Sequence, residues 1–262
     1  MPVETKAKHA LTGYEASTLE RPNGERWVTM SNALTRAGHG LTLSEKRIVA
    51  CAASKLDSRT APKTGEALRT KITAAEYAEL AGCGMSAAYE ALQDAAKNLF
   101  NRKITFFEAA HKRRGTTIKP IRNDMRWVGR CRYHEGEAWV ELSWWPDLLP
   151  YLVGIKKQFT SYQLKQASAL RSVYSWRLLE LLTRFESTGW AEYDIEDFKL
   201  SMNAPPSLSD FAQVKRRIIE PAVKELTTKD GWLIQWKPIK KGRKVSALRF
   251  DFKRDDQLAL EL

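Results

Sequence analysis

The 262-residue chain has little of what metal, redox and secreted proteins depend on. Its three cysteines, Cys51, Cys83 and Cys131, lie far apart, and no Cys-x-x-Cys pair is present to begin a zinc or redox site. Its four histidines form no His-x-His or His-x-x-x-His pair, which argues against a metallohydrolase or a metal-dependent relaxase. The sequence therefore predicts no metal site and no catalytic residues, and it predicts free thiols in a reducing compartment.

Motifs for cofactors and for membranes are also missing. The chain contains neither a Walker A loop nor a Gly-x-Gly-x-x-Gly motif, so we expect no cofactor and no motor activity. Residues 1–17 lack the apolar centre of a signal peptide, and nowhere do roughly eighteen apolar residues follow one another. We expect a cytoplasmic bacterial protein without a membrane partner.

What the chain does have is an excess of positive charge. Lys and Arg number 43 against 31 Asp and Glu, which gives a formal charge of +12, while 43% hydrophobic residues are enough for a folded core. The excess is concentrated in residues 101–134, with ten basic and two acidic side chains, and in residues 208–254, with thirteen and five. Such a balance favours a polyanionic partner.

The order of predicted elements repeats once along the chain. Residues 1–26 are polar and without periodicity, and we interpret them as a flexible arm. Thr42 opens a capping box and a first helix, and a short strand, two helices and alternating β-rich stretches follow at 68–72, 73–100, 102–107, 118–132 and 137–144. The second series has a helix, a strand, two helices and two strands, at 172–186, 190–193, 194–202, 207–228, 232–238 and 245–252. A helix-turn-helix followed by a β-hairpin is a winged helix, so the pattern predicts an α+β fold with two of them in tandem.

Three segments resemble the iteron-binding plasmid replication initiators, the Rep family with two winged-helix domains. They are residues 43–49 (LSEKRIV), 172–182 (SVYSWRLLELL) and 211–226 (FAQVKRRIIEPAVKEL), and the KKGR turn at 240–243 also matches. The resemblance implies a protein that binds directly repeated double-stranded origin sites, called iterons, and starts plasmid replication. It also implies monomers at the origin and homodimers that repress their own gene at an operator inverted repeat. Its implied host partners are DnaA, the replicative helicase, and the chaperones DnaK and DnaJ.

We divide the chain into four parts. Residues 1–26 form the arm, residues 27–153 an N-terminal winged helix for positioning and dimerisation, residues 154–254 a C-terminal winged helix that reads DNA, and residues 255–262 an acidic tail.

The candidate reading helix lies at 207–228. At about 100° per residue, one arc gathers the apolar side chains Phe211, Val214, Ile218, Ala222 and Leu226. The opposite arc gathers the polar side chains Gln213, Arg216, Arg217 and Lys224. Arg can form two hydrogen bonds with guanine, so we expect Arg216 and Arg217, with Gln213, to read bases.

Other cations are expected to contact the DNA backbone: Lys215, Lys224, Lys240, Lys241, Arg243, Lys244, Lys112, Arg113 and Arg114. The last three form a turn that we interpret as the wing of the first domain, although a solvated loop is nearly as good an interpretation. A Lys-Arg-Arg stretch alone would indicate only a solvated helix face, and its place in a helix-turn-helix favours DNA. Pro221 predicts a kink, and Glu220 would repel phosphate.

The equivalent helix of the first domain predicts a weaker DNA contact. Its apolar side carries Met85, Tyr89, Leu92, Ala96 and Leu99, and its opposite face has Lys97 as the only cation. We expect this helix to support positioning, dimer contacts or shape readout, or only to pack within its own domain.

Two other functions stay open. A dedicated transcriptional repressor with this fold would bind an operator without starting replication. A nicking initiator enzyme would need a nucleophile such as Tyr162 or Tyr174, and the missing histidine pairs argue against it. Trp232, Ile234 and Trp236 alternate as in a half-buried strand, which favours core packing over stacking on bases.

Overall fold

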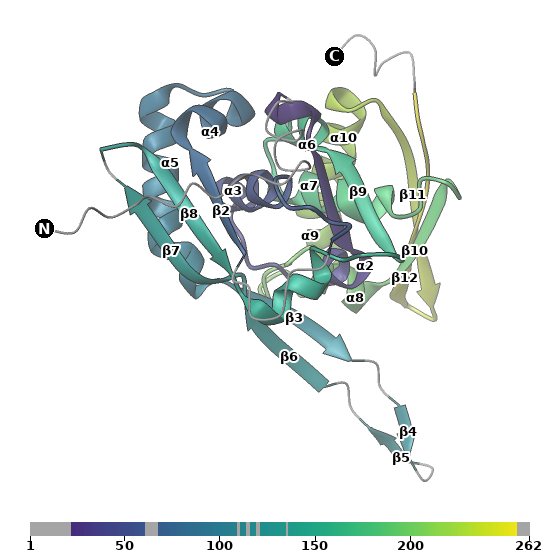
Figure 1. Ribbon diagram of the computed structural model, residues 1–262. Coiled ribbons are helices and arrows are strands. Elements are labelled where there is room, and N and C mark those ends of the chain that lie inside the picture. Colours follow the sequence, from purple (N-terminus) through teal and green to yellow (C-terminus); the bar gives the residue numbers. More distant parts are fainter. Residues whose placement is uncertain are drawn as a thin grey trace, which may run out of the picture.

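The computed structural model describes residues 22–60, 68–108, 111–113, 116–118, 121–134 and 136–255. Two winged-helix units follow one another and pack together around central helices (Figure 1). The α+β fold with two winged helices is therefore confirmed. Over the described residues, no helix is both long enough and apolar enough to span a bilayer.

The first unit contains β1 (Trp27–Ser31), α2 (Asn32–Arg36), α3 (Leu43–Ala53), β2 (Arg69–Thr73), α4 (Ala74–Ala81), α5 (Met85–Asn98), β7 (Val128–His134) and β8 (Trp139–Trp144). Between α5 and β7 the chain forms a projecting arm of two short sheets, β3 (Lys103–Glu108) with β6 (Ile121–Arg126), and β4 (His111–Arg113) with β5 (Thr116–Ile118) (Figure 1). Short 3-10 helices are η1 (Asn23–Glu25), η2 (Leu99–Asn101) and η3 (Pro146–Tyr151).

The second unit has the same order without the arm. It contains β9 (Phe159–Gln163), α6 (Leu164–Ser168), α7 (Val173–Thr183), β10 (Trp190–Asp194), α8 (Ile195–Ser201), α9 (Phe211–Val214), the π-helical turn η4 (Lys215–Ile219), α10 (Glu220–Lys229), β11 (Trp232–Lys241) and β12 (Lys244–Arg254). The sheets have matching strand orders, β2-β8-β7 and β10-β12-β11. The repeat predicted from the sequence is therefore a repeat of topology.

Local sequence signals explain the starts of two helices. Thr42 and Glu45 form a capping box at the start of α3, with the Thr42 amide donating to Glu45 Oε2 at 2.9 Å and the Glu45 amide donating to Thr42 Oγ1 at 3.3 Å. Thr73 and Glu76 do the same at the start of α4. Each box satisfies two amides that a helix would otherwise leave without partners.

Residues 22–26 correct the predicted arm, whose residues 1–21 lie outside the described part of the chain, as does most of the predicted tail, 256–262. Asn23 Nδ2 donates to Glu79 at 2.8 Å, and the Arg26 guanidinium lies 3.2 Å from the Glu76 carboxylate. The last five residues of the predicted arm are thus bound to α4. Their polar composition indicated an arm because polar side chains that pair across the fold cannot be told from solvated ones in sequence alone.

A two-stranded sheet joins the units. Strands β1 and β9 pair antiparallel, with Trp27 opposite Gln163 and Ser31 opposite Phe159. Neither strand was predicted, because each is short and its partner is more than a hundred residues away. The division expected at residues 153 and 154 stays a prediction, and β9 begins the second unit shortly after it.

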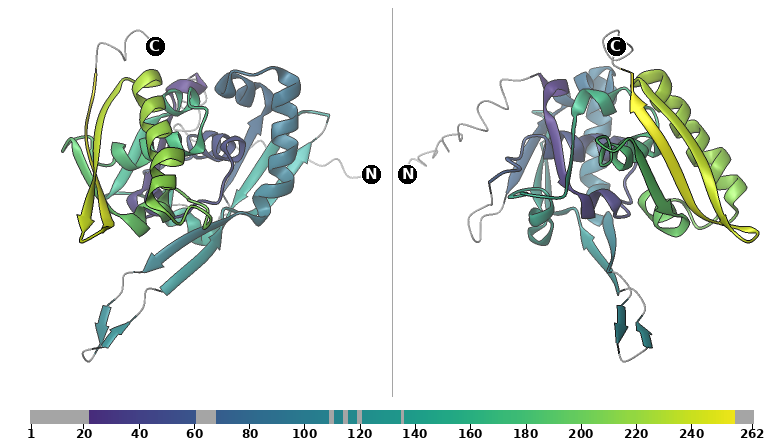
Figure 2. Two further views of the ribbon diagram at one scale, coloured as in Figure 1. Left: turned by 180° about the vertical axis from the view of Figure 1, so that it is seen from behind. Right: turned by 90° about the vertical axis from the view of Figure 1, so that its right-hand side faces the viewer.

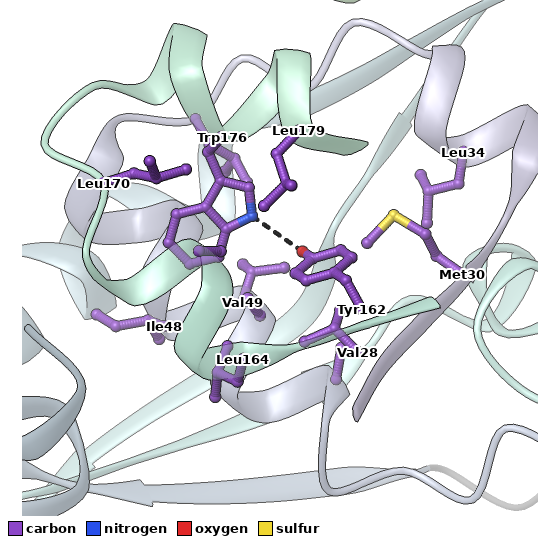
Figure 3. Close-up of a cluster of buried hydrophobic side chains, with 14 of the residues drawn as sticks. Val28, Met30, Leu34, Ile48, Val49, Tyr162, Leu164, Leu170, Trp176 and Leu179 are labelled. Atoms are coloured by element: carbon purple, nitrogen blue, oxygen red, sulfur yellow. Dashed lines mark hydrogen bonds between the residues drawn. The ribbon is translucent and has the colours of Figure 1, made fainter. Parts of the chain in front are cut away.

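The apolar core is continuous across this junction. Buried side chains from β1, α3, β9, α6 and α7 interdigitate there, namely Val28, Met30, Ile48, Val49, Tyr162, Leu164, Trp176 and Leu179 (Figure 3). The Trp176 indole N–H donates to the Tyr162 hydroxyl at 2.9 Å, so the two largest polar aromatic groups in this region satisfy each other. The units therefore share one core at this place.

Two arginines cross the junction in equivalent positions. Arg177, the fifth residue of α7, donates to the carbonyls of Thr35 and Ala37 at 2.6 and 2.8 Å, at the end of α2. Arg47, the fifth residue of α3, donates to the carbonyl of Leu170 at 2.9 Å, just beyond α6. Helices α3 and α7 thus each donate, through an arginine, to carbonyls at the end of the short helix of the other unit, α6 and α2 respectively. These carbonyls would otherwise have no helical partner.

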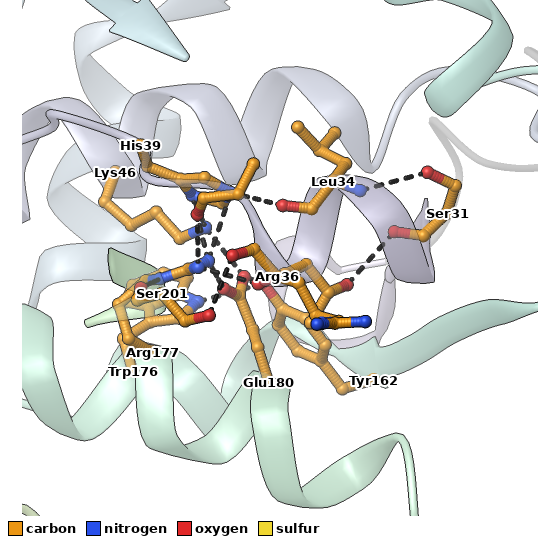
Figure 4. Close-up of polar contacts among 12 residues, drawn as sticks. Ser31, Leu34, Arg36, His39, Lys46, Tyr162, Trp176, Arg177, Glu180 and Ser201 are labelled. Carbon is orange, nitrogen blue, oxygen red and sulfur yellow. Dashed lines mark hydrogen bonds and ion pairs between the residues drawn. The ribbon is translucent and has the colours of Figure 1, made fainter. Parts of the chain in front are cut away.

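A buried charge cluster lies beside these contacts. Glu180 accepts from Lys46 Nζ at 2.7 Å, from Arg177 NH1 at 2.6 Å and from the Tyr162 hydroxyl at 2.8 Å (Figure 4). The Lys46 and Arg177 side chains are each 1% exposed and that of Glu180 is fully buried. Lys46 Nζ also lies 3.2 Å from His39 Nδ1.

The protonation of this cluster follows from its surroundings. Burial alone would raise the pKa of Glu180, but Lys46 and Arg177 outweigh it and hold that pKa below its usual value. Burial lowers the pKa of Lys46 to about 8 although Glu180 opposes the shift. Burial, Arg177 and Lys46 all lower the pKa of His39, which is therefore a neutral hydrogen-bonding group at physiological pH.

Replacing Glu180 with Gln tests the contribution of the cluster to stability. The variant leaves two buried cations without a counter-charge, so we expect the free energy of unfolding in urea to fall by about 3–5 kcal/mol. The matched control is Glu186→Gln, since Glu186 pairs with Arg254 at 2.8 Å but is half exposed. The control should lose less than about 1 kcal/mol, and equal losses in the two variants would contradict this assignment.

Candidate nucleic-acid interface

The helix-turn-helix of the second unit consists of α8 and the long helix formed by α9, η4 and α10. The connecting residues include Asn203, which has a left-handed backbone (φ 52°), and Leu208, which is buried. The long helix starts at Phe211 with Asp210 as its N-cap, whose side chain makes no capping hydrogen bond. The long helix thus begins four residues after the predicted start at 207 and ends one residue after the predicted end at 228.

A π-helical turn interrupts the long helix at Lys215–Ile219. Pro221 follows it and lacks the amide that would pair with the Arg217 carbonyl in a regular α-helix. The wider π turn accommodates the missing hydrogen bond to the Arg217 carbonyl. It stands where the sequence predicted a kink. Ile218 and Ile219, the last two residues of this turn, are both buried.

The exposed face of this helix carries the predicted cations. Arg216, Arg217 and Lys224 are exposed and Gln213 is half-buried. The apolar arc lies on the inner side as predicted: Val214, Ile218, Ala222 and Leu226 are fully buried, and Phe211 packs edge-on against Trp236 with ring centres 6.4 Å apart. The structure thus places the candidate reading side chains together on one exposed face, and their role in base reading stays a prediction.

Lys215 lies between this face and the hairpin. Its Nζ is 3.5 Å from a Glu220 carboxylate oxygen and 5.9 Å from the centre of the Trp236 ring. Both partners are weak at an exposed site, since such pairs contribute about 0–1 kcal/mol. Lys215 can therefore exchange Glu220 for a stronger anion at little cost.

The hairpin of β11 and β12 extends beside the long helix (Figure 2, right). Its turn contains Gly242, whose positive φ of 65° suits glycine. Its exposed cations are Lys237, Lys240, Lys241, Arg243, Lys244 and Lys253. On the other side of the strands Trp232 is buried and Ile234 and Trp236 are partly buried, which confirms the predicted core role of these side chains.

The helix-turn-helix of the first unit consists of α4 and α5, separated by Gly82 in a left-handed conformation (φ 60°). The buried side chains of α5 are Ala88, Leu92 and Ala95, and Leu99 at the start of η2 is buried as well. Met85 was predicted to lie on the apolar side, but its side chain is 54% exposed. The prediction is wrong there because Met85 is the first residue of the helix and lies beyond the end of the surface that α5 covers. Lys97 is the only Lys or Arg in α5.

The wing of the first unit is the β7–β8 hairpin, because β8 pairs with β2 as β12 pairs with β10. The predicted wing lies elsewhere. Lys112 and Arg113 belong to β4 near the end of the projecting arm, and Arg114 lies outside the described residues. Both hairpins have alternating sequences, so the local pattern could not tell which of them pairs with β2. A backbone-contacting role for these three residues stays a prediction.

The two candidate DNA-reading helices face the same way. Seen from behind, α5 and the α9–α10 helix both lie on the side turned toward the viewer, and the arm of the first unit extends below them (Figure 2, left). One surface therefore presents a cation-poor helix from one unit and a cation-rich helix and hairpin from the other.

Sequence reasoning missed the buried cluster of His39, Lys46, Tyr162, Arg177 and Glu180. One signal was available: Arg177 and Glu180 stand three residues apart within an otherwise apolar helical segment, where charges are rarely left without partners. Lys46 and His39 gave no comparable signal, because they meet this pair only through tertiary packing.

Comparisons with known proteins agree with this architecture. A family described as "Initiator Replication protein, WH1" matches residues 27–183, and "Initiator Rep protein, WH2" matches residues 194–252. The PI protein of Escherichia coli is 26% identical over 270 residues, covering 89% of this chain and 85% of that protein. An uncharacterized 27.6 kDa protein of Escherichia coli is 24% identical over 224 residues, covering 80% of this chain and 88% of that protein.

A solved structure shares the fold. The crystal structure of the Pi initiator protein in complex with iteron DNA aligns with a TM-score of 0.72 and 23% identity, covering 89% of this chain and 99% of that chain.

Asp230 fixes the end of the long helix against the hairpin. It is the C-cap residue of α10, and its Oδ2 accepts from the Trp232 indole at 2.7 Å and lies 3.7 Å from Arg254 NH2. Burial raises the pKa of Asp230 to about 6, although Arg254 opposes the shift. The folded protein therefore binds this proton more tightly than the unfolded chain does.

Replacing Asp230 with Asn should change how stability depends on pH. Between about pH 6, the pKa in the folded protein, and 3.8, the ordinary carboxyl pKa, only the folded state binds this proton, so its stability increases as pH falls. As pH falls from 7 to 4, the free energy of unfolding of the wild type in urea should therefore rise relative to that of Asp230→Asn, by up to about 3 kcal/mol. Asp251→Asn is the control with the opposite sign, because Arg249 lowers the pKa of Asp251. A pH-independent difference for Asp230→Asn would refute the assignment.

Proposed function

Because this chain belongs to the initiator replication protein family, we propose that it starts plasmid replication by binding iterons, repeated double-stranded sites at the origin. The observation that carries the proposal is the exposed Arg216 and Arg217 pair on the helix of a helix-turn-helix, beside a hairpin with six exposed cations. The relative whose structure contains iteron DNA has the same two-unit architecture. The protein would act in the bacterial cytoplasm.

The α9–α10 helix would lie in the major groove. Arg216 and Arg217 project from it next to each other, and a guanidinium can donate two hydrogen bonds to guanine O6 and N7, which discriminates by roughly 1–3 kcal/mol per base. Gln213, one turn earlier, can pair with adenine in the same way. The π turn at Lys215–Ile219 sets where these side chains point relative to the buried face.

Backbone contacts would come from the long helix and hairpin of the second unit and from the arm of the first unit. Lys215 and Lys224 flank the arginines along the helix, and the hairpin cations Lys240, Lys241, Arg243 and Lys244 can follow a phosphate strand. Lys112 and Arg113 in β4 of the arm, and Arg114, which lies outside the described residues, would contact a backbone farther along the DNA. None of these contacts would distinguish one base from another.

The first unit would position the second. With one cation in α5, its own grip on DNA would depend on shape and on the arm. Its further tasks are contacts in a homodimer that represses its own gene at an operator inverted repeat, and recruitment of DnaA and the replicative helicase, with DnaK and DnaJ acting on the dimer. These partners rest on the family resemblance.

One genetic experiment separates an initiator from a dedicated repressor with the same fold. The gene is placed next to its own origin on a replicon that cannot otherwise replicate, and plasmid maintenance is scored. Maintenance that depends on the gene supports initiation, whereas operator repression without maintenance would assign the protein as a repressor. A covalent protein–DNA adduct would instead indicate a nicking enzyme.

Binding to iteron DNA should weaken steeply with salt. Each neutralised phosphate releases counterions, so the logarithm of the association constant should fall against log salt with a slope of about −0.9 per contact. Six contacts give a slope of roughly −5 between 50 and 200 mM salt, measured by gel-shift titration. Salt-independent binding would be incompatible with the proposed interface.

Arg216→Ala and Arg217→Ala should relax sequence preference. Each removes a paired contact with one base, so binding-site selection should show lost discrimination of about 1–3 kcal/mol at one position of the site. Lys241→Ala is the matched control on the hairpin, and it should weaken all sequences equally and reduce the salt slope by about 1. Uniform losses for the arginine variants as well would count against base reading by this helix.

A further inference from the structure

A cavity of about 210 Å³ opens at the junction of the two units. It is lined by residues from the start of α3 and the loop before it, from the first turns of α7 and from the end of α8: His39, Gly40, Leu41, Lys46, Val173, Tyr174, Arg177, Met202 and Asn203. Sites for drug-sized ligands usually occupy roughly 300–1,000 Å³, so this cavity suits a smaller molecule. Nothing in the DNA-binding proposal uses it.

The charged groups of the cavity wall are all positive. Lys46 and Arg177 line it and are each 1% exposed, whereas Glu180, the carboxylate that pairs with both, is not among the lining residues. No Asp or Glu is part of the wall formed by the described residues. Two buried cations thus share one buried carboxylate, and one positive charge remains without a counter-charge in this cluster (Figure 4).

His39 adds a polar group without adding charge. Its Nε2 lies 2.8 Å from the Leu34 carbonyl, and this distance assigns the ring proton to Nε2. Its Nδ1 then accepts from Lys46 at 3.2 Å and from Arg177 at 3.0 Å. The ring therefore orients both cations at the cavity wall and leaves their excess charge in place.

The rest of the wall also suits an anion. Val173 and Tyr174 are the first two residues of α7, an eleven-residue helix, so the positive end of its dipole lies at the cavity. Tyr174 and Asn203 are uncharged polar residues of the lining. Asn203 is exposed, so it belongs to the rim of the cavity, and its backbone is left-handed (φ 52°).

We propose that this cavity binds the phosphate group of a small molecule, either inorganic phosphate or a nucleoside monophosphate. Lys46 from the first unit and Tyr174 and Asn203 from the second would surround the phosphate oxygens, and the anion would balance the excess buried charge. Arg177 would contribute its charge alone, because its five N–H groups already donate to three carbonyls, Glu180 and His39. A tetrahedral oxyanion fits this wall better than a planar carboxylate, because the donors come from three different segments. The bound anion would tie the two units together independently of DNA.

The test uses the full chain without DNA. Isothermal titration with inorganic phosphate, at an ionic strength held constant with sodium chloride, should show saturable binding at one site per chain. A parallel titration with adenosine monophosphate identifies the source: tighter binding assigns a nucleotide, and equal or weaker binding assigns free phosphate. Absence of saturable binding in both titrations, or equally tight binding of acetate, overturns the proposal.

Two variants test the location. Asn203→Asp places a negative charge at the exposed rim in a residue that tolerates the left-handed conformation, and it should weaken phosphate binding about tenfold. Lys46→Met leaves Arg177 and Glu180 as a balanced pair, so it should fold and should lose at least about tenfold in affinity. The matched control is Asn123→Asp, an equal charge change at an exposed position of β6 in the arm.

The outcomes are distinct from those of DNA binding. Wild-type phosphate affinity in Asn123→Asp together with losses in the other two variants supports the site. Equal weakening in Asn123→Asp and Asn203→Asp would reduce the effect to net charge, and wild-type affinity in Lys46→Met would remove the cavity as the binding place. Either result overturns the proposal and leaves the iteron-binding proposal untouched.

Discussion

The arrangement of the two winged helices depends on one buried ionic contact, the carboxylate of Glu180 held between Lys46 and Arg177. Lys46 belongs to α3 of the first unit and the other two belong to α7 of the second. Taking three charges out of water is expensive, and the geometry must be close to ideal to offset it. A wrong relative orientation of the units would leave these charges without partners, so the cluster selects one orientation more strongly than apolar packing would.

The backbone contacts around the cluster extend the same constraint. Arg177 and Arg47 each reach the carbonyls after the short helix of the other unit, and β1 pairs with β9 between them. These contacts are related by the topological repeat, so each unit contacts the other through equivalent residues. The DNA-facing helices α5 and α9–α10 are held on one side of the molecule as a consequence (Figure 2, left).

Local patterns in the sequence predicted the parts of the fold that depend on local physics. The capping boxes at Thr42 and Thr73 fix helix starts through groups three residues apart, and the arc from Val214 to Leu226 follows from helical periodicity. The exposed position of Arg216 and Arg217 follows from the same periodicity. These features need no knowledge of distant residues, and the structure confirms them.

Other features depend on partners far along the chain, and the sequence could not place them. The β1–β9 sheet joins Thr29 to Ser161, whose hydroxyl groups lie 2.8 Å apart, and Lys46 meets Glu180 across a similar separation. The arm and the wing of the first unit look alike locally, and only the pairing of β8 with β2 tells them apart. Pro221 indicated a kink, but the sequence did not show that the kink takes the form of a π turn at Lys215–Ile219.

We propose that the α9–α10 helix chooses the DNA sequence, while the first unit, whose helix α5 has a single cation, positions it. The most direct measurement is a crystal structure of this chain bound to one iteron. We expect the guanidinium groups of Arg216 and Arg217 within about 3 Å of guanine O6 and N7 in the major groove, with Lys241 and Arg243 on phosphates. A complex in which α5 makes the base contacts and both arginines face solvent or phosphate would contradict it.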